Sequence, residues 1–194
     1  LTRPPKRSDV LSVFAGLRPL AAPRSEGKKT KEISRSHKLI REKSGLITII
    51  GGKWTTYRKM AQDTLDLAIR YMHIPTKDCI TERYQIHGSR KNPDFSDPLY
   101  VYGTDADEIR NLVASSPAMA EKLHPDYAYT VGEVTWLVRN EMPRTLEDVL
   151  ARRLRILFLD ARAAMAMAPK VAGILATEWG KDETWTSAQV KAFN

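Results

Sequence analysis

The chain has 194 residues, of which 42% are hydrophobic and 28% are charged, an ordinary composition for a globular protein of one or two domains. No apolar run approaches the roughly 20 residues of a membrane span, and the single cysteine, Cys79, excludes an internal disulfide and has no second cysteine with which to hold a metal. The net charge of +8 favours an anionic partner. Nucleic acid is disfavoured as that partner, because the basic run over residues 24–43 contains no Phe, Tyr or Trp side chain on which a base could stack.

The first predicted element is an apolar strand over residues 10–15, followed by Gly16-Leu17-Arg18-Pro19. Pro19 restrains the residue before it to an extended conformation, so Arg18 is expected to leave the sheet edge in a fixed direction. A guanidinium in that place suits an oxyanion. A structural salt bridge is an equally good interpretation of Arg18 taken alone.

Residues 31–50 alternate between polar and apolar and carry the turn signal Ser44-Gly45, which predicts a β-hairpin or two adjacent strands. The apolar run at residues 46–50 is typical of a strand covered on both faces in a parallel or mixed sheet. Arg35 and His37 lie two apart and share a face. With Arg18 and Lys53 they could form a cationic pocket, although a lone histidine is more often a polar surface residue.

The stretch LITIIGGKWTTYRKM, residues 46–60, predicts a strand, a turn and a helix start. Gly51 and Gly52 permit positive φ and close approach of a ligand, while Thr55 or Thr56 can cap the helix. Lys53 adds positive charge beside the helix N-terminus, which predicts a site for a phosphate or an electron-rich ring. A P-loop is excluded because its first glycine and its Ser/Thr are missing. A plain strand-turn-helix with a surface lysine remains the alternative.

The remaining chain is expected to be helical. A helix over residues 55–72 should bury one face, formed by Ala61, Leu65, Ala68 and Met72. Residues 76–98 read as a linker with at most a short strand at 84–86. Three threonine-acid pairs predict N-terminal capping boxes: Thr104 with Asp107, Thr130 with Glu133, and Thr145 with Asp148.

The helices of the second half are expected to be separated by Pro117, Pro143 and Pro169. The longest should span residues 146–168 with one apolar stripe, followed by helices at 170–179 and, more weakly, at 187–193. A group of charged residues in this half is interpreted as structural ion pairs rather than a catalytic cluster: Arg139, Glu141, Arg144, Asp148, Arg152 and Arg153.

Three stretches in order, SVFAGLRPL, ISRSHKL and GLITIIGGKWTTYRKMAQDTLD, resemble the C-terminal part of the flavin domain of FAD-dependent glycerol-3-phosphate dehydrogenases. Residues 134–164 are similar to the helical C-terminal domain of the same family. The resemblance implies an α+β fragment: a few strands and a helix from an FAD-binding α/β domain at residues 1–75, a linker at 76–98, and a mostly α-helical domain at 99–194.

The resemblance also implies roles for individual residues. Arg18 and Lys53 would be the catalytic residues of this chain, lying near flavin and substrate, and Arg35 would hold the phosphate of glycerol 3-phosphate. The cofactor-binding residues would face the pyrimidine edge of the flavin, which gains negative charge on reduction: Gly51, Gly52, Lys53, Thr55 and Thr56.

The implied reaction is oxidation of sn-glycerol 3-phosphate to dihydroxyacetone phosphate, with electrons passing through FAD to a quinone. One alternative is an oxidase that uses dioxygen, and another is a non-catalytic basic helical module that binds protein, nucleic acid or a membrane surface. No two glycines have the G-x-G spacing of a dinucleotide-binding turn, so the adenosine half of the site and the general base are expected outside this chain, which should be inactive alone. A cytoplasmic place, peripheral on the inner face of the cell membrane, and a homodimer complete these expectations.

Overall fold

A computed structural model describes residues 3–17 and 36–194, which are mostly helical, with one small antiparallel sheet. The chain divides into two compact units, Leu1–Ala15 with His87–Asn194, and Gly16–Ile86. We call the first the helical unit and the second the hairpin unit. The division follows the packing of the chain, and the domain limits expected from the sequence stay a prediction.

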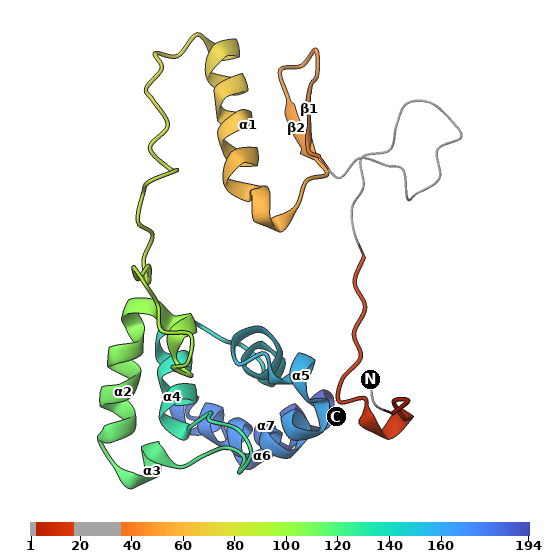
Figure 1. Ribbon diagram of the computed structural model, residues 1–194, viewed down its shortest axis with the longest axis vertical. Coiled ribbons are helices and arrows are strands. Elements are labelled where there is room, and N and C mark those ends of the chain that lie inside the picture. Colours follow the sequence, from red (N-terminus) through yellow and green to blue (C-terminus); the bar gives the residue numbers. More distant parts are fainter. Residues whose placement is uncertain (1–2, 18–35) are drawn as a thin grey trace. The chain divides into compact units, whose positions relative to one another are not determined.

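The hairpin unit contains strands β1 (Lys38–Arg41) and β2 (Ile47–Ile50), then α1 (Tyr57–Met72), which packs along the hairpin (Figure 1). The strands pair antiparallel with Lys38 opposite Ile50, and Gly45 closes the turn by donating from its N–H to the carbonyl oxygen of Glu42 at 3.0 Å. The predicted hairpin and its turn are therefore confirmed. The expected parallel or mixed sheet, covered on both faces, is wrong: the pair is antiparallel, and all four residues of β2 are half-buried.

The buried face of α1 also differs from the prediction. Ala61, Leu65 and Met72 are exposed, whereas Met60 and Tyr71 turn toward the hairpin, where Arg41 lies 3.7 Å from the ring centre of Tyr71. The helix ends at Met72 with His73 in the left-handed region at φ 52°. Residues 73–99 contain turns and no regular element, so the short strand considered at residues 84–86 is wrong.

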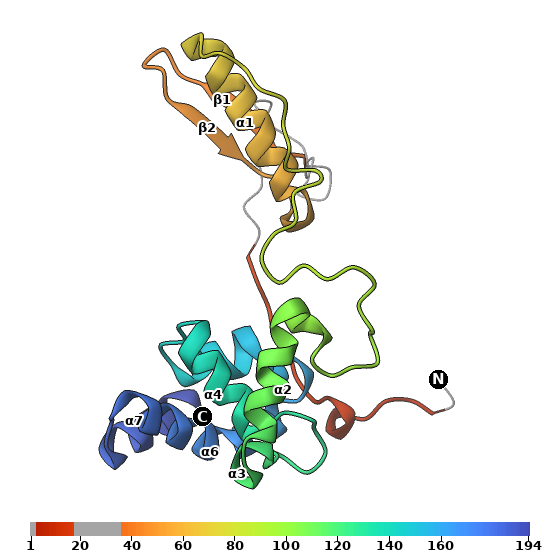
Figure 2. The ribbon, with the colours of Figure 1, turned by 90° about the vertical axis from the view of Figure 1, so that its left-hand side faces the viewer.

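The helical unit contains six α-helices, which Figure 2 shows from the side, and its core forms chiefly where α4 packs against both α2 and α6. Their bounds are α2 Ala106–Ala114, α3 Pro117–Ala120, α4 Val131–Asn140, α5 Ile156–Leu159, α6 Ala161–Trp179 and α7 Glu183–Phe193. Gly132 allows α2 and α4 to approach closely, because a Cβ there would lie 2.9 Å from Val113 Cγ2. None of the described helices has the length and apolar character required to cross a membrane.

The long helix expected over residues 146–168 is interrupted. A π-helical turn, Asp148–Arg153, adds one residue to the helical turn, with Leu154 N donating to Val149 O at 2.9 Å. Arg155 then adopts φ 62°, α5 follows, and Asp160 caps a new start for α6. The predicted apolar stripe is buried as far as Leu154 but not at Phe158 or Met165, because the breaks at Arg155 and Asp160 prevent the later positions from continuing the same helix face.

Pro169 lies inside α6 and does not separate two helices as expected. The carbonyl that loses its partner belongs to Met165, four residues earlier, and both residues are exposed, so water can satisfy the carbonyl. Helix α7 is longer than predicted, because Asp182 caps it at 2.8 Å from Trp185 N.

Two of the three predicted caps are present. Thr130 accepts from Glu133 N at 3.2 Å, and Thr145 and Asp148 form a reciprocal capping box. Thr104 does not cap α2, which is preceded by Asp105 in a 3-10 turn.

The segment expected to form a strand at residues 10–15 is not in a sheet among the described residues. It contacts the region of α5 instead: Leu11 O accepts from Ala161 N at 3.0 Å, Ser12 Oγ donates to Leu157 O at 2.7 Å, and the Phe14 ring meets Phe158 edge to face. An apolar extended segment pairs with whichever backbone and side chains it can reach, here those of residues 157–161.

Candidate functional site

The turn between β2 and α1 is the part of the predicted site that the structure describes best. Gly51 and Gly52 have φ values of 76° and 87°, so both use the positive φ that the sequence predicted. A Cβ on Gly52 would lie 2.5 Å from Met60 Sδ and 3.4 Å from His37 Cβ. The space beside Gly52 is therefore used for packing α1 against the hairpin, and the closer approach of a cofactor to this glycine stays a prediction.

The two threonines do not cap α1 with their side chains. Thr56 occupies the N-cap position, but its hydroxyl accepts from Lys53 N at 3.3 Å and donates to Lys53 O at 3.0 Å. Thr55 is exposed and its hydroxyl has no hydrogen bond within the described part of the chain. The side-chain cap expected here is wrong, and the N–H groups of the first turn of α1 receive no side-chain acceptor from it.

Lys53 and Trp54 give this turn its chemical character. Lys53 is exposed, and its ammonium forms no ion pair with any residue that the structure describes. Trp54 is 86% exposed and stacks on Tyr57 with ring centres 5.5 Å apart. A cation, an exposed aromatic ring and a helix N-terminus together favour a planar or anionic ligand carrying negative charge at its edge.

This chemistry fits one edge of the flavin ring of FAD, the cofactor that the family resemblance implies. The N–H groups of α1 and the Lys53 ammonium can both stabilise negative charge. Residues 53–57 are all exposed, so the described part of the chain supplies one wall of such a site and does not enclose a ligand.

His37 is held by α1. Its Nε2 lies 3.0 Å from Asp63 Oδ2, while Lys59 Nζ lies 2.8 Å from Asp63 Oδ1. The hydrogen bond from Lys59 is the main cause that lowers the pKa of Asp63, and the bond to His37 contributes in the same direction. Asp63 was not identified from the sequence, although its i,i+4 spacing from Lys59 was a usable signal.

Arg18 and Arg35, the other two predicted site residues, lie outside the described residues. The cationic pocket predicted from Arg18, Arg35, His37 and Lys53 therefore stays a prediction. Within the described part, His37 binds Asp63, and only Lys53 remains as an unpaired cation of that set.

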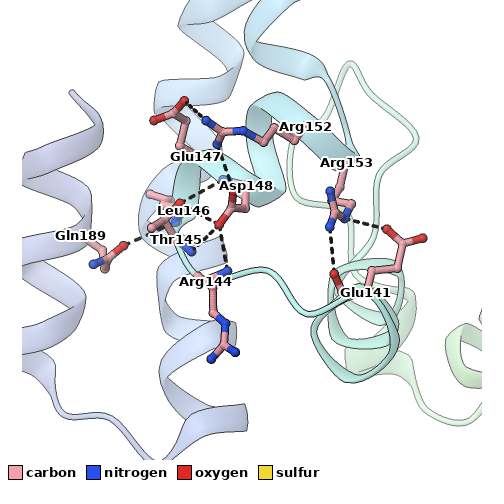
Figure 3. A network of polar contacts seen from close by, with 9 residues as sticks. All are labelled: Glu141, Arg144, Thr145, Leu146, Glu147, Asp148, Arg152, Arg153 and Gln189. Carbon is pink, nitrogen blue, oxygen red and sulfur yellow. Dashed lines mark hydrogen bonds and ion pairs between the residues drawn. The ribbon is translucent and has the colours of Figure 1, made fainter. Parts of the chain in front are cut away.

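The charged group in the helical unit is structural, as predicted (Figure 3). Arg153 Nε lies 2.7 Å from Glu141 Oε2, and Arg153 also donates to Glu141 O at 2.8 Å. Arg152 joins Glu147 at 2.7 Å and Asp148 at 3.0 Å. The contacts of Arg153 tie the end of α4 to the π-helical turn, whereas those of Arg152 lie within that turn and its N-cap residue.

Two further contacts complete that interpretation. Arg139 on α4 forms a bidentate pair with Glu178 on α6 at 2.7 and 2.8 Å. Arg144 contributes its backbone N–H to Asp148, and its guanidinium points away from the network in Figure 3. The group therefore holds helices together through ion pairs and backbone contacts.

Comparison with known proteins gives a consistent result. Residues 46–186 match the family model described as the C-terminal domain of alpha-glycerophosphate oxidase. The chain is 34% identical to a mitochondrial glycerol-3-phosphate dehydrogenase of Arabidopsis thaliana, covering 91% of this chain and 33% of that protein. It is 36% identical to a probable mitochondrial glycerol-3-phosphate dehydrogenase of Caenorhabditis elegans, covering 96% and 28%, respectively. It is 31% identical to the mitochondrial glycerol-3-phosphate dehydrogenase of Homo sapiens, covering 92% of this chain and 27% of that protein.

The chain thus spans about a third of the length of the curated relatives that it matches. The match includes the β2 strand, the Gly51-Gly52-Lys53 turn, α1 and most of the helical unit.

Proposed function

Because the chain belongs to the family of the C-terminal domain of alpha-glycerophosphate oxidase, we propose that it is the C-terminal portion of a flavoprotein that oxidises sn-glycerol 3-phosphate to dihydroxyacetone phosphate. The observation that carries the proposal is the turn at Gly51, Gly52 and Lys53, in which both glycines have positive φ and Lys53 is exposed, set before the N-terminus of α1. The chemistry that bound FAD would supply is acceptance of a hydride from C2 of the substrate and transfer of the electrons to the final acceptor.

The described residues act on charge and position. The Lys53 ammonium and the N-terminus of α1 stabilise negative charge on the ring edge, so reduction becomes more favourable. The pair of His37 with Asp63 holds the start of β1 against α1 and so fixes the direction of the turn. Arg18 beside the substrate oxygen and Arg35 at the phosphate remain predictions of the resemblance.

A quinone is the proposed electron acceptor, and dioxygen is the second candidate. The relatives are dehydrogenases by name, whereas the family model takes its description from an oxidase, so both acceptors have support. Stopped-flow oxidation of the reduced protein by a soluble quinone analogue and by dioxygen separates the two: the acceptor that reoxidises the flavin within the turnover time is the functional one.

Because the proposed acceptor is a quinone, we propose that the protein works at a membrane surface. Its contact with the membrane would be peripheral. The cytoplasmic face of a cell membrane was expected from the sequence, and the relatives are mitochondrial by name. Fractionation of the native protein distinguishes these two places. A homodimer stays a prediction that sedimentation of the purified protein tests.

The proposal is tested by producing the chain alone and joined to the residues that precede it in its gene. We expect the longer protein to bind flavin and to be bleached by glycerol 3-phosphate, and the chain alone to do neither. A longer protein without flavin would refute the enzymatic assignment and would favour the basic helical module. Reduction of flavin by the chain alone would refute the expectation that part of the flavin site lies outside this chain.

Single substitutions in the longer protein test the assigned residues. Lys53→Met should slow flavin reduction by about tenfold or more while changing flavin content less, since the charge acts on the reduced ring. Lys43→Met, in the exposed turn of the hairpin, is the matched control and should leave the rate unchanged. Equal rates in the two variants would remove Lys53 from the site. Arg18→Met should likewise depress reduction more than flavin content.

A further inference from the structure

Helix α1 has two apolar faces, and the hairpin covers one of them. Met60 and Tyr71 belong to the covered face, which meets the hairpin at Gly52 and Gly45. The other face, which we call the outer stripe, has the four, four, three and four spacing of one side of a helix: Tyr57, Ala61, Leu65, Ala68 and Met72. Its three large side chains are open to solvent in the described part of the chain, with exposed fractions of 56% at Tyr57, 61% at Leu65 and 64% at Met72.

The charged side of α1 is a different side. Lys59, Asp66 and Arg70 are all exposed and lie roughly opposite the outer stripe, as the helical repeat requires. A helix that leaves a side to water places its charged residues there. Because α1 already has such a side, the outer stripe is a second apolar face and not the solvent face. A contiguous exposed apolar surface of this kind marks an interaction site.

The charges of α1 favour a protein surface over a lipid surface. Arg58 lies at the edge of the outer stripe, but its guanidinium already donates to Gln62 Oε1 at 2.9 Å and lies 3.4 Å from Glu82 Oε1. The helix contains three basic residues and two acidic ones, whereas a helix that lies on anionic lipid has a polar side rich in Lys and Arg. An uncharged apolar protein surface fits the stripe better, since the buried centres of protein interfaces are depleted of charge.

The relatives indicate where such a surface comes from. The chain covers 33% of its Arabidopsis thaliana relative and 28% of its Caenorhabditis elegans relative, so most of a protein of that kind lies outside these 194 residues. The family is described as a C-terminal domain, and its match includes α1. Residues joined covalently to α1 have a higher effective concentration at the outer stripe than a separate protein has.

We propose that the outer stripe is a docking face for an uncharged apolar surface in the part of the parent protein that precedes this chain. Leu65 lies at the centre of the contact, and the small side chains of Ala61 and Ala68 let the partner approach closely. Docking there fixes α1 and, at its N-terminus, the turn at residues 51–53. The proposal rests on the proposed function in taking this chain as a portion of a longer protein.

The test compares thiol labelling at two neighbouring positions, Leu65→Cys in the outer stripe and Asp66→Cys on the charged side, each with Cys79→Ser to remove the native thiol. Labelling by a maleimide is followed by mass spectrometry in the chain alone and in the chain joined to the residues that precede it in its gene. In the chain alone the two cysteines should react at similar rates. In the longer protein Leu65→Cys should react about tenfold or more slowly than Asp66→Cys, because a covered thiol reacts only when the contact opens.

Equal labelling of the two cysteines in the longer protein would overturn the proposal. Protection of Leu65→Cys in the chain alone would overturn it as well, because residues of this chain or a second copy would then cover the stripe. Flavin content, recorded on the same samples, separates this proposal from the enzymatic one. Protection without bound flavin would support docking and count against the proposed function, whereas bleaching by glycerol 3-phosphate with an unprotected Leu65→Cys would support the function and refute docking.

A measurement on the unaltered proteins covers the case in which Leu65→Cys does not fold. Met72 lies in the outer stripe, and hydrogen peroxide converts an accessible methionine to its sulfoxide. Peptide mass spectrometry measures its oxidation, with free methionine added to each sample to calibrate the peroxide dose. Met72 should oxidise about tenfold more slowly in the longer protein than in the chain alone. The same rate in both proteins would refute docking at this face.

Discussion

The helical unit and the hairpin unit differ in what they bury. In the helical unit Leu137, Leu150, Met167 and Val171 are fully buried in one core. In the hairpin unit no described residue reaches that class, and Leu46, Trp54 and Leu65 stay more than half exposed. A hairpin with one helix buries less apolar surface than a packed group of helices does. The helical unit therefore has a buried core, and the described part of the hairpin unit has none.

This difference bears directly on function. The proposed cofactor edge, from Gly51 to Thr56, lies in the unit whose described residues include none that is buried. The helical unit has a buried core of its own. The two units should therefore respond differently when the chain is studied alone.

The largest expected difference is in hydrogen exchange. In the chain alone, amides of α4 and α6 should exchange at least about 100-fold more slowly than those of α1, since slow exchange requires opening of a packed core. Mass spectrometry after timed exchange measures this. Slow exchange throughout α1 in the isolated chain would abolish the distinction between the units.

Core truncation gives the next largest effect. Leu137→Ala removes a fully buried side chain and should lower the free energy of unfolding by about 2–5 kcal/mol. Leu65→Ala, at a side chain 61% exposed, should change it by less than about 0.5 kcal/mol. Urea denaturation followed by circular dichroism compares the two. A comparable loss from Leu65→Ala would reveal a covered face on α1.

Two glycines with positive φ sharpen the contrast. A Cβ on Gly103 would overlap the carbonyl oxygen of Gly88, so Gly103→Ala must move backbone and should cost about 3 kcal/mol or more. Gly52→Ala meets chiefly the flexible end of Met60, with His37 Cβ at an ordinary contact distance, and should cost about 1–2 kcal/mol in the unit that contains it. Gly173→Ala, in helix α6 with no atom near its Cβ, is the control and should be neutral or stabilising.

The smallest effects concern pH, and they have opposite signs in the two units. The raised pKa of Glu133 means that its contribution to stability is present below its ordinary value of 4.5 and is lost as pH rises through the folded value. The lowered pKa of Asp63 means that its contribution is present above 3.8 and is lost as pH falls through the folded value.

Variants isolate these two groups from the other carboxylates. Relative to Glu133→Gln, the unaltered chain should lose stability as pH rises above 4.5; relative to Asp63→Asn, it should lose stability as pH falls below 3.8. Denaturation curves at several pH values measure both differences. A difference from Glu133→Gln that does not depend on pH would contradict the burial of this carboxyl group.

Part of the fold could be predicted from neighbouring residues alone. The Ser44-Gly45 turn, the helix that ends at Met72, the caps at Thr130 and Thr145, and the structural role of the pair of Glu141 with Arg153 are all present. Each depends on contacts within a few residues or on charges at helix ends, which spacing reveals. The same local motifs supported the resemblance that the family match confirms.

The sequence by itself therefore determined the hairpin, the helical character of the second half and the family, because backbone preferences and short-range capping act within a few residues. Only the tertiary structure decided where the long helix breaks at Arg155, which face of α1 meets the hairpin, where residues 10–15 pack, and that Glu133 is buried against Tyr102. Those outcomes depend on residues distant in sequence, whose packing decides which of several locally acceptable arrangements is lowest in free energy.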